Sequence, residues 1–156
     1  MEQIKELFWA RVKVARETGS LGRGFRYDLE DYLGSIWPEK LRPGLIPMSV
    51  GAAKLAPNGI RQHGEGKPLG LAFEHSVPLK VIGSLLLEAE TQEAMMRILE
   101  RYVQIVWVTK DEDIRLNQMG LRSKMPADWD RTTYARYVAA GIELNHQHYV
   151  SAQKEA

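Results

Sequence analysis

Proline is concentrated in one part of this chain, and that concentration limits where regular structure can form. Five of the seven prolines are Pro38, Pro43, Pro47, Pro57 and Pro68. Proline lacks a backbone N–H and fixes φ, so it interrupts helix interiors and central strands. We therefore predict irregular, extended structure over residues 38–68, with one short helix near residues 48–55. Regular elements are then expected before and after this segment.

Apolar periodicity predicts two helices before the proline-rich segment. Over residues 2–18 the helical spacing is carried by Ile4, Leu7, Phe8, Val12 and Ala15. Gly19 is expected to end this helix. A second helix is predicted over residues 28–36, with Asp28 as its cap. Residues 1–37 therefore form an N-terminal helical part.

After the proline-rich segment, the pattern alternates between strands and helices. Residues 69–75 (LGLAFEH) and 103–108 (VQIVWV) are predicted strands. Between them lie predicted helices over residues 78–87 and 91–102, the first beginning at Pro78. A helix then begins at Thr109, where Glu112 completes a capping box, and ends at Gly120. Residues 121–144 are a loop and a final helix from residue 132, and residues 145–156 are a tail.

Composition supports one α+β domain spanning residues 1–156 and consisting mainly of helix. The chain is 44% hydrophobic and 26% charged, which is typical of a globular domain of this length. It has no cysteine, which excludes disulfides, thiolate metal sites and a cysteine nucleophile. Its longest apolar stretch is far shorter than a membrane span, and its N-terminus is charged, unlike a secretory signal. We expect a cytoplasmic protein without a membrane partner.

Two short motifs suggest chemistry. The first strand ends in Glu74-His75 and is followed by Ser-Val-Pro. The capped helix after the second strand reads TKDEDIRLN and carries Asp113 and Asn117. Because these two residues are four apart, they project from one side of that helix.

The two motifs resemble those of the HNH, or ββα-metal, nuclease superfamily. In that family an Asp-His or His-His pair, then two residues and a proline, end the first strand, and a helix after the second strand closes the site. The resemblance covers about residues 70–117, as a two-stranded element with a helical insertion within residues 69–120. It implies a metal-dependent endonuclease that hydrolyses nucleic-acid phosphodiester bonds, with DNA as the expected substrate.

The resemblance also implies roles for individual residues. His75 matches the general base, Glu74 the first metal ligand, and Asn117 the last, with Asp113 at the other ligand position of the helix. A divalent ion, with Mg²⁺ expected, would stabilise charge on the phosphate. This arrangement requires the chain to leave strand geometry between Glu74 and His75, because neighbouring residues of a strand face opposite sides.

Basic residues near the closing helix provide candidate contacts to nucleic acid. Arg115 lies on that helix, and Arg122 and Lys124 follow it directly. Two basic stretches, around residues 11–26 and 115–136, fit a phosphate-facing surface on a chain whose net charge is only +1. Ordinary charge scatter on a solvated surface explains the same stretches.

Other interpretations remain open. The closing helix has Asp113 and Asn117 where the family usually has histidines, and the second strand lacks the asparagine that orients the base. These departures fit a catalytically inactive helical interaction module or a nucleic-acid-binding accessory protein, such as one from a phage or mobile element. A homodimer or a protein partner is a further expectation. Glu74-His75 can also be an ordinary strand end, and Trp129 is expected in the core rather than stacked on a base.

Three weaker candidates lie elsewhere in the chain. His63 is in a glycine-rich loop whose spacing is not that of a P-loop. Glu65-Gly66-Lys67 matches a three-residue nuclease element, which is close to a chance match. His146 and His148 alternate in the tail, where a metal pair is the alternative to a solvated end.

Overall fold

The computed structural model describes residues 2–36, 47–57 and 70–145. The remaining residues include His63, Glu65, Lys67, His146 and His148, so the predictions made for these side chains lie outside the described ranges. Where the proline-rich segment is described, it contains the predicted short helix, α3 (Val50–Leu55). Ser49 caps this helix, and its side chain accepts a hydrogen bond from the amide of Ala52.

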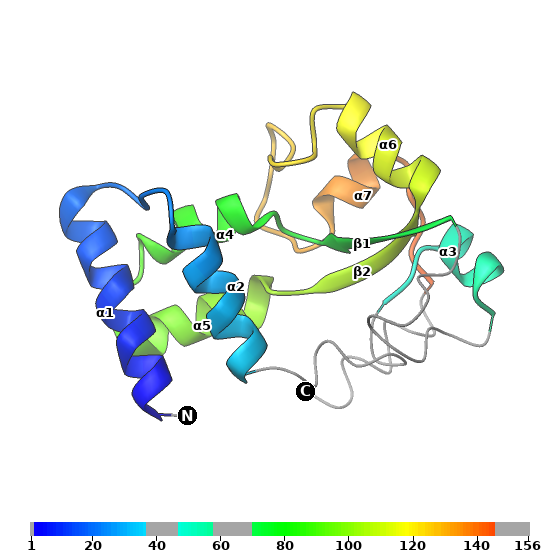
Figure 1. Cartoon of the computed structure of the whole chain (residues 1–156). Helices are drawn as coiled ribbons and strands as arrows, with labels where there is room; N and C mark the ends of the chain where they lie inside the picture. The colour runs from blue at the N-terminus through cyan, green and yellow to red at the C-terminus, as the bar shows by residue number, and fades with distance from the viewer. Residues whose placement is uncertain (1, 37–46, 58–69, 146–156) are drawn as a thin grey trace.

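Four helices pack together in one half of the molecule (Figure 1). They are α1 (Glu2–Thr18), α2 (Phe25–Ile36), α4 (Leu79–Leu86) and α5 (Gln92–Tyr102). Apolar residues from all four helices build one buried core, which includes Phe8, Leu29, Ile82 and Leu99. Trp129 packs against this core, as predicted, with its ring 5.9 Å from that of Tyr102.

The second half is built on a two-stranded antiparallel sheet. Strand β1 (Leu71–His75) pairs along its length with β2 (Ile105–Thr109), with Phe73 opposite Trp107 and Glu74 opposite Val106. Helices α6 (Lys110–Gln118) and α7 (Ala135–Ala139) lie over one face of the sheet. On the other face, α3 and the residues before it cover Ile105 and Trp107. The predicted α+β class is therefore confirmed.

Two predicted helix boundaries are wrong. Helix α2 begins at Phe25 rather than at Asp28, because Phe25 is buried in the core while Asp28 lies in the first turn and pairs with Arg11. The final helix, predicted over residues 132–144, is limited to the five residues of α7. Gly141, with a φ of +63°, ends that segment, and Leu144 then forms an antiparallel bridge with Ser49.

Within the described ranges, no helix combines the length and the apolar character needed to cross a bilayer. The longest helix, α1, has charged residues along much of its length.

Candidate functional site

Glu74 lies on the face of the sheet that α6 and α7 cover. Strand alternation places it on the same side as Ala72, and its partner Val106 belongs to the core beneath the two helices. Its carboxyl group lies near enough to Asp113 on α6 for the two to interact electrostatically. Burial raises the pKa of Glu74, and Asp113 raises it further, whereas Arg136 opposes this rise. The sheet and α6 thus bring together two of the predicted ligands.

Arg136 on α7 is the group that holds Glu74 in place. Arg136 is 0% exposed, and its guanidinium donates a hydrogen bond of 2.9 Å to a carboxylate oxygen of Glu74. It also donates to the backbone carbonyls of His75, Ser76, Leu121 and Arg122. A guanidinium has five N–H donors and is costly to bury unpaired, so this set of acceptors explains how it is accommodated.

His75 faces away from Glu74. Strand β1 continues through His75, which pairs with Ile105, so the expectation that the chain leaves strand geometry at this junction is wrong. The physical reason is that the ladder with β2 fixes both residues in extended conformation, and their side chains project from opposite faces. The His75 ring lies 6.1 Å from that of Phe73, on the α3 side of the sheet.

The environment of His75 keeps its imidazole neutral. Burial, which is the largest cause, together with the charges of Arg136 and Arg26, lowers the pKa of His75 to about 4, against an opposing effect of Glu30. Its Nδ1 is buried and has no hydrogen-bond partner among the described residues. His75 is therefore a partly buried neutral ring that does not face the Glu74–Asp113 pair.

Asn117 lies one turn beyond Asp113 on α6. It is exposed, and its side chain makes no hydrogen bond to another described residue. Across residues 2–36, 47–57 and 70–145, no group of three or more histidine, aspartate or glutamate side chains is placed to hold a metal ion. What this part of the sheet offers is a pair of carboxyl groups, Glu74 and Asp113, with the cation of Arg136 already bound to one of them.

As arranged, these residues do not fit a divalent ion. A metal ligated by Glu74 would approach the positive charge of Arg136, which lies 2.9 Å from the same carboxylate. Burial, the largest cause, and the nearby Asp113 also raise the pKa of Glu74, so a metal would have to compete with a proton for this carboxyl group. No catalytic step through a metal follows from this geometry.

The predicted phosphate contacts fall into two groups. Arg115 donates hydrogen bonds to the carbonyls of Ala140 and Gly141, so it helps to hold the end of α7. Arg122 and Lys124 are exposed and form no salt bridge with any other described residue. Because Arg136 binds the carbonyl of Arg122, the loop that carries these two cations lies at the end of β1.

The sequence did not point to two other residues of this site, Lys80 and Arg136. Lys80 is exposed in the first turn of α4, immediately after β1, and carries no ion pair in the described part of the chain. Arg136 was not singled out either, since nothing in its local sequence separates a buried arginine from the surface arginines around it. Arg136 lies four residues before Ala140, which is also buried. This helical spacing is the one feature of the sequence that would have placed Arg136 on the buried side of a helix.

Comparisons with family models, with curated proteins and with solved structures find no match to this chain.

Proposed function

We propose that this protein binds nucleic acid, and that the cation of Arg136 occupies the place where the HNH-like element would hold a metal. The observation that carries this proposal is the ion pair between the buried guanidinium of Arg136 and Glu74. A permanent cation there balances the carboxylate without a bound ion. The element then serves as a scaffold for binding rather than as a centre for hydrolysis.

The same arginine supports the nucleic-acid part of the proposal. Its hydrogen bonds to the carbonyls of Leu121 and Arg122 hold the following loop against the end of β1. The side chains of Arg122 and Lys124 point into solvent from this anchored loop. Anchored, exposed cations suit contacts to phosphate, because less conformational freedom is lost on binding.

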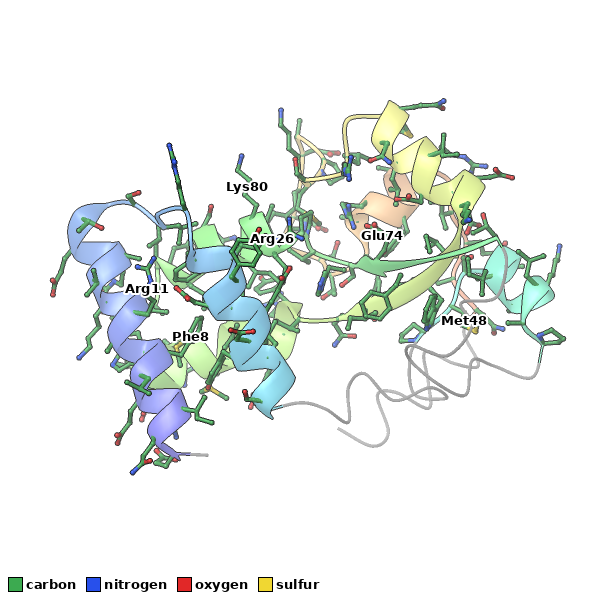
Figure 2. The ribbon with its side chains drawn as sticks, viewed as in Figure 1. Phe8, Arg11, Arg26, Met48, Glu74 and Lys80 are labelled. Atoms are coloured by element: carbon green, nitrogen blue, oxygen red, sulfur yellow. The ribbon has the colours of Figure 1, made fainter. Side chains whose placement is uncertain are left out.

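Further positive charge lies near the same strand end. Lys80 lies five residues after the end of β1, and the charge of Arg26 acts on His75 at the last position of that strand. Figure 2 shows both labelled side chains in the region where α2 meets the start of α4. Arg26 forms a salt bridge with Glu30, so Lys80 is the stronger candidate for a phosphate contact. Phosphate contacts of this kind carry no sequence information, so binding is expected to be weakly specific.

The proposal is tested by titrating labelled duplex DNA, single-stranded DNA and RNA in EDTA, with fluorescence anisotropy as the readout. The slope of log K against log salt is compared between wild type and the pair Arg122→Ala/Lys124→Ala. Loss of two phosphate contacts should make the slope shallower by about 2. The matched control is Lys54→Ala/Arg97→Ala, which removes two exposed cations from α3 and α5. Equal slopes in all three proteins would contradict the proposed surface.

Metal-dependent cleavage of nucleic acid is the second candidate function. The observation that favours it is the order β1, β2, α6, which brings Glu74 against Asp113 as the family resemblance requires. Its test is plasmid cleavage in Mg²⁺ or Mn²⁺ by wild type, Glu74→Gln and His75→Ala. Cleavage by wild type that both variants lose would establish this candidate in place of the first. Intact plasmid in every metal would remove it.

A further inference from the structure

The loop that joins α6 to α7 (Figure 1) turns two successive backbone carbonyls toward the interior. The carbonyls of Leu121 and Arg122 both accept hydrogen bonds from the same nitrogen, Nη1 of the buried Arg136. In a trans peptide the carbonyl of one residue and the amide of the next point in opposite directions. The amides of Arg122 and Ser123 are therefore both directed away from Arg136 and toward solvent.

These two amides are available to a ligand. Neither donates a hydrogen bond to another described residue, and both residues are exposed. Successive amides that point the same way are a backbone arrangement with which proteins bind anions. The positive charge of Arg136 lies behind them, because its guanidinium holds the two carbonyls. The outer side of this loop therefore favours an anion.

The hydroxyl of Ser123 is a third donor at the same place. It makes no hydrogen bond with another described residue, whereas the hydroxyl of Ser20, in the loop between α1 and α2, accepts one from the amide of Gly22. The side chains on either side of Ser123 are Arg122 and Lys124, which form no salt bridge in the described part of the chain. Outward amides, a hydroxyl and two cations match the oxygens and the charge of a phosphate group.

We propose that residues 122–124 hold one phosphate group of the bound nucleic acid. The amides of Arg122 and Ser123 and the hydroxyl of Ser123 donate hydrogen bonds to its oxygens, and the side chains of Arg122 and Lys124 flank it. This inference rests on the proposed function for the identity of the ligand. It adds to that function a fixed phosphate position, at which the backbone and a neutral hydroxyl contribute besides charge.

Binding of inorganic phosphate to the full chain tests the loop without nucleic acid. Phosphate is titrated to about 50 mM against a chloride series of equal ionic strength, and NMR spectra follow the backbone amides. The amides of Arg122 and Ser123 should shift in a saturable way, with a Kd in the millimolar range because one small anion makes few contacts. The amide of Gly22 should not shift. Equal shifts in phosphate and chloride would overturn the proposed phosphate position.

Titration of labelled DNA in EDTA tests the hydroxyl. Ser123→Ala should raise the Kd for DNA by about threefold to tenfold, since one hydrogen bond to a charged group is lost. Because the hydroxyl is neutral, the slope of log K against log salt should stay that of wild type. The matched control is Ser20→Ala, which removes a hydroxyl from the other loop and should leave Kd unchanged.

The two experiments separate this inference from the proposed function. DNA binding that Ser123→Ala leaves unchanged contradicts the hydroxyl contact, while nucleic-acid binding itself stands. A phosphate-specific shift of the Arg122 and Ser123 amides without any binding of DNA supports the phosphate-binding loop and contradicts nucleic acid as its ligand. Far-ultraviolet circular dichroism checks that both variants keep the helix content of wild type.

Discussion

Arg136 and Glu74 form a salt bridge of 2.9 Å between residues 62 positions apart in the chain. The arginine side chain is 1% exposed and the glutamate side chain 22% exposed. The contact joins α7 to β1, and through the carbonyl of Leu121 it also fixes the loop between α6 and α7. The fold of the second half of the molecule and the proposed binding surface therefore depend on the same arginine.

Arg136→Met should destabilise the protein by about 3–5 kcal/mol, since it leaves Glu74 partly buried without its counter-ion. Several backbone carbonyls also lose their donor. Urea denaturation gives the free energy of unfolding. Adding Glu74→Met to Arg136→Met removes the stranded charge and should recover part of the loss. Arg97→Met, an exposed arginine on α5, is the control and should change stability by less than about 0.5 kcal/mol. Equal effects of Arg136→Met and the control would show that the ion pair has no structural role.

The pKa of His75, lowered to about 4 from an ordinary value of 6.5, makes stability depend on pH in a defined direction. Between these values the unfolded chain takes up a proton that the folded chain does not, so stability falls as pH falls from 6.5 to 4. The loss should reach about 3 kcal/mol. His75→Phe removes this group, and its urea midpoint should fall less than that of wild type over the same range. Parallel pH profiles for the two proteins would mean that His75 titrates normally.

The sequence predicted most elements because each rests on a local signal. Apolar periodicity located α1 and α5, and the capping box of Thr109 and Glu112 located the start of α6. The end of α7 could not be predicted, because Tyr134, Tyr137 and Ile142 continue a helical pattern past the point where the chain turns. Ile142 lies in a non-helical segment and is still buried, so its apolar side chain reaches the core without a longer helix.

Glu112→Ala should lower the free energy of unfolding by about 1–3 kcal/mol, as measured by chemical denaturation. One carboxylate oxygen of Glu112 accepts hydrogen bonds from the amide of Thr109 and from the hydroxyl of Ser49, so it joins the starts of α6 and α3. Thr91→Ala is the comparison, because it removes one capping bond on α5 without a link to another helix. If Glu112→Ala lowers the free energy of unfolding less than Thr91→Ala does, Glu112 does not join α6 to α3.

Two glycine substitutions should change stability in opposite directions. A Cβ at Gly34 in α2 meets nothing within 4 Å, so Gly34→Ala should stabilise the protein by about 0.5–1 kcal/mol. A Cβ at Gly51 in α3 would lie 2.9 Å from a carboxylate oxygen of Glu112, so Gly51→Ala should destabilise it. Thermal melting of both variants gives the sign. Stabilisation by Gly51→Ala would show that Glu112 can move aside at no cost.

Much less of the candidate site than of the fold could be predicted. The order of the motifs was sufficient to place Glu74 near Asp113, because the two strands and α6 pack together. It was not sufficient to place His75, whose direction depends on whether the strand continues for one more residue. Nor could it find Arg136, since the contact with Glu74 depends on how α7 returns over the sheet.

Binding of nucleic acid in the absence of metal is the central claim, and one titration tests it most directly. Wild type and Glu74→Gln are titrated with labelled DNA over a series of salt concentrations, once in EDTA and once in Mg²⁺. We predict measurable binding by both proteins, weakening with salt in proportion to the number of phosphate contacts. Absence of binding at low salt, or binding that requires a divalent metal and is lost in Glu74→Gln, would contradict the account.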